Sequence, residues 1–463
     1  MKNVFALILL LAVSLCSFGT HNAAGEIIYQ FTSANTVRAS IITYTKQSSF
    51  QADRDTMLIH WGDGSPNDLI PRTNGPLGVS GVPNGEPIGN DLKKNIYIGS
   101  HTYTTASAGS FYIISMTDPN RNSDIINISN PVNVQFYIED TVWFQNQGLD
   151  HSPILLYPPI DFANVGDTFF HNPTAYDVEA DSLVFDLVEP MQGLGNIVPG
   201  YISPEQVILL PGNTLTIERR NGMVTWASPQ QTGIYVIAIM IREYRYGVLL
   251  GTMTRDMQIV VRADTSGRSP LNGNFVDTTI IAGQHFELDC SAMDTNAVHI
   301  NTLTATGGPF IVSSSPATFT STPANQPTGI MSWAPGHNLY KTRETHIVTI
   351  CARNNDTTHL TTLRSFRITV VDSSQTAISE ISDSHTFVKI YPNPAQDILN
   401  VSAITAVHSM GIYSADGKLI RQVSNIDKNA FDIAIKDLAG GHYFIRLRDS
   451  QGSISSARFE ILR

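Results

Sequence analysis

The sequence predicts an all-β protein, built from tandem antiparallel β-sandwiches and a small C-terminal β-sandwich. The 463-residue chain is only 15% charged and is rich in Thr, Ser and Asn, a composition that favours strands and turns over helices. Runs of β-branched and aromatic residues recur between clusters of Gly, Pro, Asn and Asp, without sustained helical periodicity. The clearest runs are residues 37–44, 111–116, 132–138, 235–241 and 443–447.

The length of the chain limits the number of domains, and its charge limits the class of partner. A chain of 463 residues is long enough for three or four domains. There are 29 Lys and Arg residues against 40 Asp and Glu residues, and the formal net charge is −11. Because the phosphates of nucleic acids need a basic surface, this balance argues against a nucleic acid partner.

Residues 1–19 have the pattern of a secretory signal peptide. Lys2 precedes an apolar run at residues 5–15, and small residues follow it ahead of a cut after residue 19. We therefore expect passage through the Sec translocon. The run is too short to span a bilayer, which disfavours the alternative of a retained membrane anchor. A lipoprotein cut at Cys16 is the other alternative, and the bulky residue before this cysteine disfavours it.

The cysteine count agrees with export. Of the three cysteines, Cys16 leaves with the signal peptide, so Cys290 and Cys351 remain as one pair. In an oxidising compartment such a pair predicts a disulfide. A bridge that closes a loop of about 60 residues stabilises a fold by about 4 kcal/mol in the chain-entropy model. The alternative is two buried thiols without a bond between them.

The middle of the chain contains an internal repeat. The segment that runs from Gly166-Asp167-Thr168-Phe169 to Ala175-Tyr176-Asp177 recurs 117 residues later, from Gly283-Gln284-His285-Phe286 to Ala292-Met293-Asp294. Further landmarks follow in the same order in both copies: a Gly-x-x-x-Trp segment ending at Trp226 or Trp333, then a proline, an arginine and a final β-branched run. We therefore predict two tandem sandwiches at residues 141–263 and 264–372. Both resemble immunoglobulin-like domains, in which facing strands can carry a bridge across the core.

Residues 20–140 form another predicted β-sandwich. Trp61 runs into the turn Gly62-Asp63-Gly64, and a later strand carries His101 and Tyr103. This pattern resembles the PKD-like domains of extracellular proteins, although the Trp directly abuts the turn. Residues 66–95 are rich in Gly, Pro and Asn and are predicted to be a surface insertion. The opening residues 23–27 (Ala-Ala-Gly-Glu-Ile) and the strands that follow them also resemble the first domain of large surface proteins in gliding bacteria of the Bacteroidota.

The C-terminal module, residues 386–463, follows a predicted linker at residues 373–385 that lacks aromatic residues. The module has a Tyr-Pro-Asn-Pro-Ala opening, an Asp-Gly-Lys hairpin turn and a Leu-x-x-Gly-x-Tyr segment before a terminal strand. The residues that carry this pattern are Tyr391, Pro392, Asn393, Pro394, Ala395, Gly417, Lys418, Gly441 and Tyr443.

This order of motifs resembles the type A sorting domain of type IX secretion cargo. The resemblance implies three partners: the type IX outer-membrane translocon, a cell-surface sortase that removes the domain, and surface lipopolysaccharide when the cargo is attached rather than released. It implies a location outside the cell, either secreted or on the outer surface.

The sequence contains none of the catalytic motifs that we sought, such as Gly-x-Ser-x-Gly, His-Glu-x-x-His or a phosphate loop. One acidic turn resembles the calcium sites of cadherin-like tandem domains: Asp177, Glu179 and Asp181 alternate after a strand. The alternative is a solvated acidic turn, and no other cofactor is expected. Tyr244, Tyr246 and Trp143 are candidates for stacking on an extracellular glycan, against the alternative that they are core residues.

The sequence therefore predicts a non-enzymatic secreted or cell-surface protein, exported through its C-terminal sorting domain. Its tandem sandwiches are expected to serve adhesion, surface structure or a gliding-related coat. The alternative is a secreted hydrolase, or a carbohydrate-binding accessory protein, whose site residues meet only in space.

Overall fold

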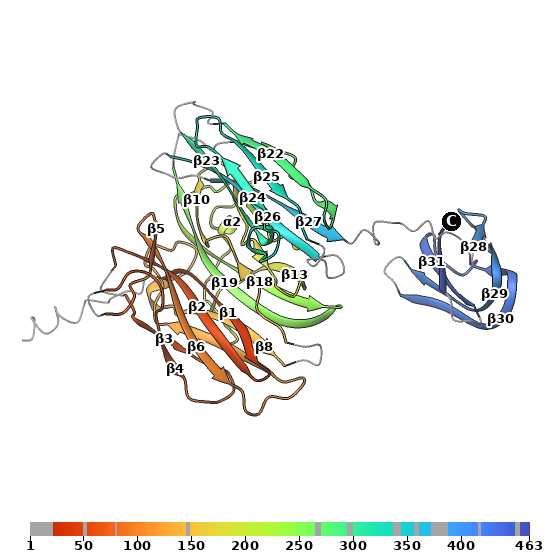
Figure 1. Cartoon of the computed structure of the whole chain (residues 1–463), viewed down its shortest axis with the longest axis horizontal. Coiled ribbons are helices and arrows are strands. Elements are labelled where there is room, and N and C mark those ends of the chain that lie inside the picture. The colour runs from red at the N-terminus through yellow and green to blue at the C-terminus, as the bar shows by residue number, and fades with distance from the viewer. Residues whose placement is uncertain are drawn as a thin grey trace, which may run out of the picture. The chain divides into compact units, whose positions relative to one another are not determined.

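The computed structural model describes residues 22–49, 53–78, 81–144, 149–263, 270–293, 300–336, 344–355, 361–371, 388–414, 418–449 and 454–463. The predicted signal peptide at 1–19 and the predicted linker at 373–385 lie outside these ranges. The chain divides into two compact units, residues 1–372 and 373–463 (Figure 1). Strands make up most of both units, so the predicted all-β class is confirmed.

The N-terminal part of the first unit has a core of its own, built around Trp61. Alternation creates this core: Ile27, Tyr29 and Phe31 are buried in it on one strand, while between them Ile28 packs against the neighbouring core around Trp226 and Gln30 is exposed. Gly62 follows Trp61 at φ 82°, and a Cβ there would lie 2.5 Å from a backbone oxygen, so the turn requires glycine. The strands of this part are β1 (Asn22–Ser33), β2 (Thr36–Lys46), β3 (Thr56–Ile59), β4 (Asp68–Pro71), β5 (Glu86–Gly89), β6 (Leu92–Thr102), β7 (Phe111–Asp118) and β8 (Phe136–Trp143).

The first repeat copy is organised by one long hairpin, in which β18 pairs with β19. Its two-residue turn places Tyr246 and Gly247 at positive φ, as a primed hairpin turn requires. The elements are β9 (Ile154–Leu155), β10 (Ile160–Asn164), β11 (Phe169–His171), β12 (Ala175–Tyr176), β13 (Ser182–Val188), β14 (Met191–Gly193), β15 (Asn196–Ile197), α2 (Pro204–Val207), β16 (Leu215–Ile217), β17 (Val224–Trp226), β18 (Gly233–Arg245) and β19 (Val248–Arg262).

Strand β19 joins the N-terminal part to the first copy. Besides β18, it pairs with β1 through Ala24 and Met257, and with β8 through Asp140 and Met253. The two segments predicted at 20–140 and 141–263 therefore share one ten-stranded sheet. The position predicted for the boundary between them falls inside β8. Sequence periodicity did not predict this sharing, because it reports which face of a strand is buried and not which strand lies beside it.

The second copy consists of two four-stranded sheets around Trp333. Its elements are β20 (Leu271–Gly273), β21 (Thr278–Ile281), β22 (Phe286–Ala292), β23 (Asn301–Gly307), α3 (Gly308–Ile311), β24 (Thr318–Ser321), β25 (Thr328–Trp333), β26 (Glu344–Asn354) and β27 (Thr361–Val371).

The landmarks of the sequence repeat make the same contacts in both copies. Phe169 pairs with Trp226 in the first, and Phe286 pairs with Trp333 in the second. The amide of the landmark glycine donates to a proline carbonyl in each copy, over 2.8 Å and 2.6 Å. The closing strands β19 and β27 each accept a parallel partner, β10 and β21. The repeated residues therefore hold the same places in two similar sandwiches.

The second unit is a five-stranded β-sheet structure with a core of its own. Strand β29 is long enough to pair with β28 and β30 in its first half, and with β30 and β31 in its second half. The strands are β28 (Val388–Tyr391), β29 (Ile398–Ser414), β30 (Leu419–Ala434), β31 (Gly441–Asp449) and β32 (Ile454–Ile461).

In the described ranges, helices are few and short. Besides α2 and α3, a 3₁₀ turn spans Pro131–Asn133. Among the residues that the structure describes, no helix has the length and apolar character needed to cross a membrane.

Candidate functional site

The Tyr-Pro-Asn-Pro-Ala motif lies against the terminal strand β32 of the second unit. The Asn393 side-chain amide donates to the Arg458 carbonyl over 3.1 Å, and its Oδ1 accepts the Glu460 amide over 2.9 Å. The Ala395 amide donates to the Glu460 carbonyl over 2.7 Å, and Ala395 is fully buried. Tyr391 is 56% exposed. Asn393 and Ala395 thus hold the motif in place, while Tyr391 faces solvent.

The other residues of the sorting pattern lie at turns and strand ends. Lys418 closes the hairpin, since its carbonyl accepts the Ser414 amide over 3.0 Å. Gly417 lies outside the described residues. Gly441 begins β31, at φ 148°. The Tyr443 hydroxyl donates to the Ala439 carbonyl over 3.0 Å, and its ring stacks on Phe459. The bracketing prolines Pro392 and Pro394 both follow cis peptide bonds.

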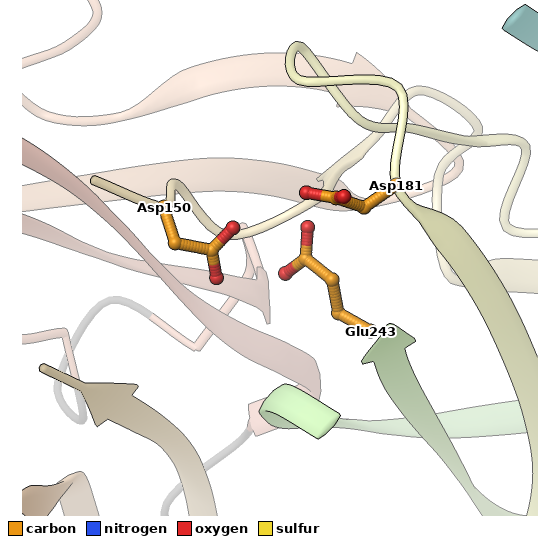
Figure 2. Close-up of side chains that lie close together, drawn as sticks. All are labelled: Asp150, Asp181 and Glu243. Atoms are coloured by element: carbon orange, nitrogen blue, oxygen red, sulfur yellow. The ribbon is translucent and has the colours of Figure 1, made fainter. Parts of the chain in front are cut away.

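A cluster of carboxylates surrounds the acidic turn of the first copy. Asp177, Glu179 and Asp181 lie between β12 and β13, and each offers an oxygen within 4.8 Å of the other two. Asp181 also belongs to a second group within the same distance, with Asp150 and Glu243. Figure 2 shows the carboxylates of this second group pointing toward one another. The fold therefore brings together five acidic residues, of which the sequence pattern had singled out three.

Two residues of the carboxylate cluster were missed because they come from other parts of the chain. Asp150 lies in the segment that precedes β9, and Glu243 lies near the end of β18. Register places Glu243 opposite Leu183 of β13, directly after the acidic turn. The sequence signal for Glu243 is weak, because it is one of three charged residues at the end of a strand whose earlier residues are apolar.

Two basic side chains contact the carboxylate cluster. Arg245 pairs with Asp150 over 3.0 Å and with Asp181 over 2.5 Å. His151 contacts Glu179 over 2.5 Å. The Asp177 Oδ1 accepts the backbone amide of Asp181, which shapes the turn. Of these two side chains, Arg245 is the one that carries a permanent positive charge.

Burial perturbs the acids of the carboxylate cluster. It raises the pKa of Asp150 to about 8, against the lowering effect of Arg245. Burial also raises the pKa of Asp177, and that of Glu179, where the Asp177 charge adds to it. The pKa of Glu243 is raised well above its ordinary value, by burial and then by the charge of Asp177. The negative charges of the cluster are thus poorly balanced by nearby positive charges when all of its acids are ionised.

Asp177 and Asp181 line a cavity of about 500 Å³ in the first unit, so the carboxylate cluster is reached from that side. The same cavity is lined by Arg219 and Arg367, which already pair with Asp186 and Asp277 in ion pairs of 2.9 Å and 2.6 Å.

The disulfide predicted between Cys290 and Cys351 is not formed, since both thiols are free and buried. Cys290 lies in the core of the second copy, as do Ile350 and Ala352. Because side chains alternate along a strand, Cys351 between them faces the other side of β26. Its Sγ lies 3.8 Å from the Tyr157 hydroxyl of the first copy. The thiols therefore belong to two different sheets, with Cys290 in the core between them and Cys351 on the outer face of the sheet that contains β26, which the count of cysteines could not reveal.

The Gly-Asp-Gly turn of the N-terminal part is held by hydrogen bonds and stacking. Asp63 lies 2.8 Å from His101, and the His101 ring stacks on Trp61 with centroids 4.9 Å apart. The Tyr103 hydroxyl donates to the Trp61 carbonyl over 2.9 Å. These contacts join the residues of the predicted pattern into one structural cluster.

The aromatic candidates for a glycan surface differ in their exposure. Tyr246 is 91% exposed at the tip of the β18–β19 hairpin, and Tyr244 is half-buried. Trp143 is also half-buried and packs against Phe111, which is 55% exposed, with ring centroids 5.5 Å apart.

Comparisons with solved structures find similarity at low identity. One match is SGBP-B of the Bacteroides ovatus mixed-linkage glucan utilization locus, solved with a mixed-linkage heptasaccharide: 10% identity, TM-score 0.14, 65% of this chain and 66% of that chain. The match thus spans just under two thirds of that protein. Others are the protocadherin GammaB4 extracellular domain, at 12% identity and TM-score 0.18 over 88% and 60% of the chains, and human CDH23 EC21-23, at 12% and 0.17 over 66% and 100%.

Comparison with curated proteins finds no match. Comparison with protein families finds one, the secretion system C-terminal sorting domain, which matches residues 389–459. These residues cover β28 to β31 and most of β32 in the second unit. The chain therefore carries a C-terminal sorting domain, which supports export by type IX secretion.

Proposed function

We propose that this chain is a non-enzymatic protein exported by the type IX secretion system, with β-sandwiches that act outside the cell in adhesion or surface structure. The observation that carries the proposal is the match of residues 389–459 to the sorting-domain family. That segment lies in a compact unit of its own, residues 373–463, as we expect of a sorting domain that is cleaved off after export. The route begins with residues 1–19 at the Sec translocon, and the type IX translocon completes it.

In this proposal each segment of the mature chain has a role. Residues 20–140 are a PKD-like sandwich, supported by a core built around Trp61. Residues 141–263 and 264–372 are immunoglobulin-like copies, supported by their equivalent strand pairings. Residues 373–385 link them to the sorting domain at 386–463. A sortase removes this last segment, after which the protein is attached to surface lipopolysaccharide or released.

An extracellular glycan is the second partner class in this proposal. Sugars stack on flat rings, and the pair of Phe111 and Trp143 presents such rings at the surface. Tyr246 adds an exposed ring on another hairpin.

Deletion of residues 386–463 tests the export route. The truncated chain should accumulate in the periplasm, whereas the full chain should reach the surface or the medium. As a matched experiment, residues 373–463 fused to a periplasmic carrier should move that carrier outside. Arrival of the truncated chain at the surface at the wild-type level would contradict the proposal. Surface biotinylation with intact-mass analysis then identifies the cut position and distinguishes tethered protein from released protein.

A further inference from the structure

Four buried oxygens of the carboxylate cluster have no hydrogen-bond partner in the described part of the chain. They are Asp150 Oδ2, Asp177 Oδ2, Glu179 Oε2 and Glu243 Oε1. Asp150 and Glu243 are each only 2% exposed, so bulk water does not replace the missing partners. A buried carboxylate oxygen without a partner costs free energy, and four in one cluster require protons or a bound ligand to offset that cost.

The charge balance of the carboxylate cluster indicates the sign of that ligand. Five carboxylates face one permanent cation, Arg245, and one histidine, His151. Ionised carboxylates this close repel one another strongly in a buried site. Either protons or a bound cation can relieve the repulsion. At neutral pH a divalent cation does so without removing the carboxylates as ligands.

We propose that Asp150, Asp177, Asp181 and Glu243 bind a calcium ion, with Glu179 at the edge of the site. Calcium binds oxygen ligands at about 2.3–2.6 Å, so two oxygens on the same ion lie no more than about 5.2 Å apart. Within each three-residue group, one oxygen of every residue lies within 4.8 Å of the other two, and Asp181 is common to both groups. Carboxylates are the hard ligands that calcium prefers. The site is a property of the first unit and does not depend on the proposed export route.

The geometry also provides a path for the ion. Asp177 and Asp181 line the cavity of about 500 Å³, and Asp150 and Glu243 lie behind them, almost fully buried. A large substrate cannot reach the two buried acids, whereas a single ion can. This arrangement favours a cation site over a catalytic carboxylate pair.

Comparison with the second copy indicates that the sandwich does not require an acid at the position of Glu243. Register pairs Ile239 with Arg255 in the first copy and Ile350 with Arg364 in the second. Counting four residues along each strand, Glu243 therefore corresponds to Asn354, which is also buried. The same sandwich thus forms with an uncharged side chain at this position, so the carboxylate of Glu243 serves something other than folding.

Calcium titration of the mature full-length protein tests the proposal. Removal of divalent ions with a chelator should lower the melting temperature of the first unit, and Ca²⁺ at a hundredfold excess over its dissociation constant should raise it by about 3–4 °C. Tb³⁺ bound at the site should luminesce when Tyr29 is excited, because Tyr29 lies near Glu243. The Tyr29 hydroxyl and Glu243 Oε2 are each 3.8 Å from the position that a Cβ on Gly251 would take. An unchanged melting temperature together with absent Tb³⁺ luminescence would overturn the proposal.

The variant Glu243→Gln separates ion binding from a structural role. In chelator it should be at least as stable as the wild type, because one buried charge is gone, and in Ca²⁺ the wild type should be the more stable protein. Its affinity for Ca²⁺ should fall at least tenfold. The matched control is Asp186→Asn, a carboxylate of β13 outside the cluster, which should bind Ca²⁺ as the wild type does. Equal affinity in Glu243→Gln and the wild type would place the ion elsewhere and refute the site.

Discussion

Glu26 and Arg255 form a buried ion pair although 229 residues separate them in the sequence. The Arg255 Nε lies 2.5 Å from one oxygen of Glu26 and its Nη2 lies 2.9 Å from the other, so the pair is bidentate. The third donor, Nη1, contacts the Tyr157 carbonyl over 2.7 Å. Neither charged side chain is more than 1% exposed. The pair connects β1 to β19, the strand that the N-terminal part shares with the first copy.

Glu26→Gln should destabilise the first unit strongly. The substitution leaves Arg255 as a buried cation without its counter-charge, and breaking a buried pair in this way costs about 3–5 kcal/mol. The matched control is Asp277→Asn, which breaks the solvent-exposed pair with Arg367 and should cost less than about 1 kcal/mol. Urea denaturation of the full chain measures both. Equal losses in the two variants would show that burial does not govern these pairs.

The two cysteines should be unreactive thiols in the native protein. Burial raises the pKa of Cys290 to about 11 and that of Cys351 to about 12, so little thiolate is present at pH 8. Iodoacetamide should label neither residue in the native state and both residues in guanidinium, without any reductant. Mass spectrometry counts the labels. A requirement for reductant before labelling would mean that the cysteines are bridged after all.

His346 should make the first unit less stable in acid. Burial lowers its pKa to about 4, whereas an unfolded histidine titrates near 6.5. Between these pH values the unfolded chain binds a proton that the native chain does not bind. The free energy of unfolding therefore falls by up to about 3 kcal/mol as the pH drops from about 6.5 to 4. His346→Phe keeps a ring against Tyr176 and Trp333 and should lose less stability over this range.

The control for this pH experiment is His285→Phe, an exposed histidine of the same copy. Its melting temperature should follow the wild-type pH dependence between pH 4 and 7. If His346→Phe also follows the wild-type curve, other groups account for the acid sensitivity.

Asn393→Ala should loosen the second unit. It removes two hydrogen bonds to β32, with an expected cost of about 1 kcal/mol because the bonds are exposed. Tyr391→Ala changes an exposed residue two positions earlier and should leave stability nearly unchanged. Limited proteolysis of the full chain reports the difference as faster cleavage within residues 386–463. Equal cleavage rates in the two variants would show that Asn393 does not hold the motif.

Sequence reasoning worked where the signal is local. The glycine turn after Trp61 could be read from neighbouring residues, because backbone geometry sets it. The repeat could be recognised because Phe169 and Phe286 occupy the same position in two copies of one pattern. Reasoning failed for Cys351, whose direction depends on which face of β26 meets the core, and for Asp150 and Glu243, which lie far from the acidic turn in the sequence.

By itself, the sequence determined the all-β class, the repeated sandwich and the sorting pattern near the end of the chain, since each depends on short-range spacing of turns and side chains. Only the tertiary structure decided that β19 is shared between two segments, that one thiol faces the core of the second copy while the other faces away from it, and that five acids converge. These features depend on pairing between strands that lie far apart in the sequence. No local pattern of residues shows which distant strand will become a neighbour.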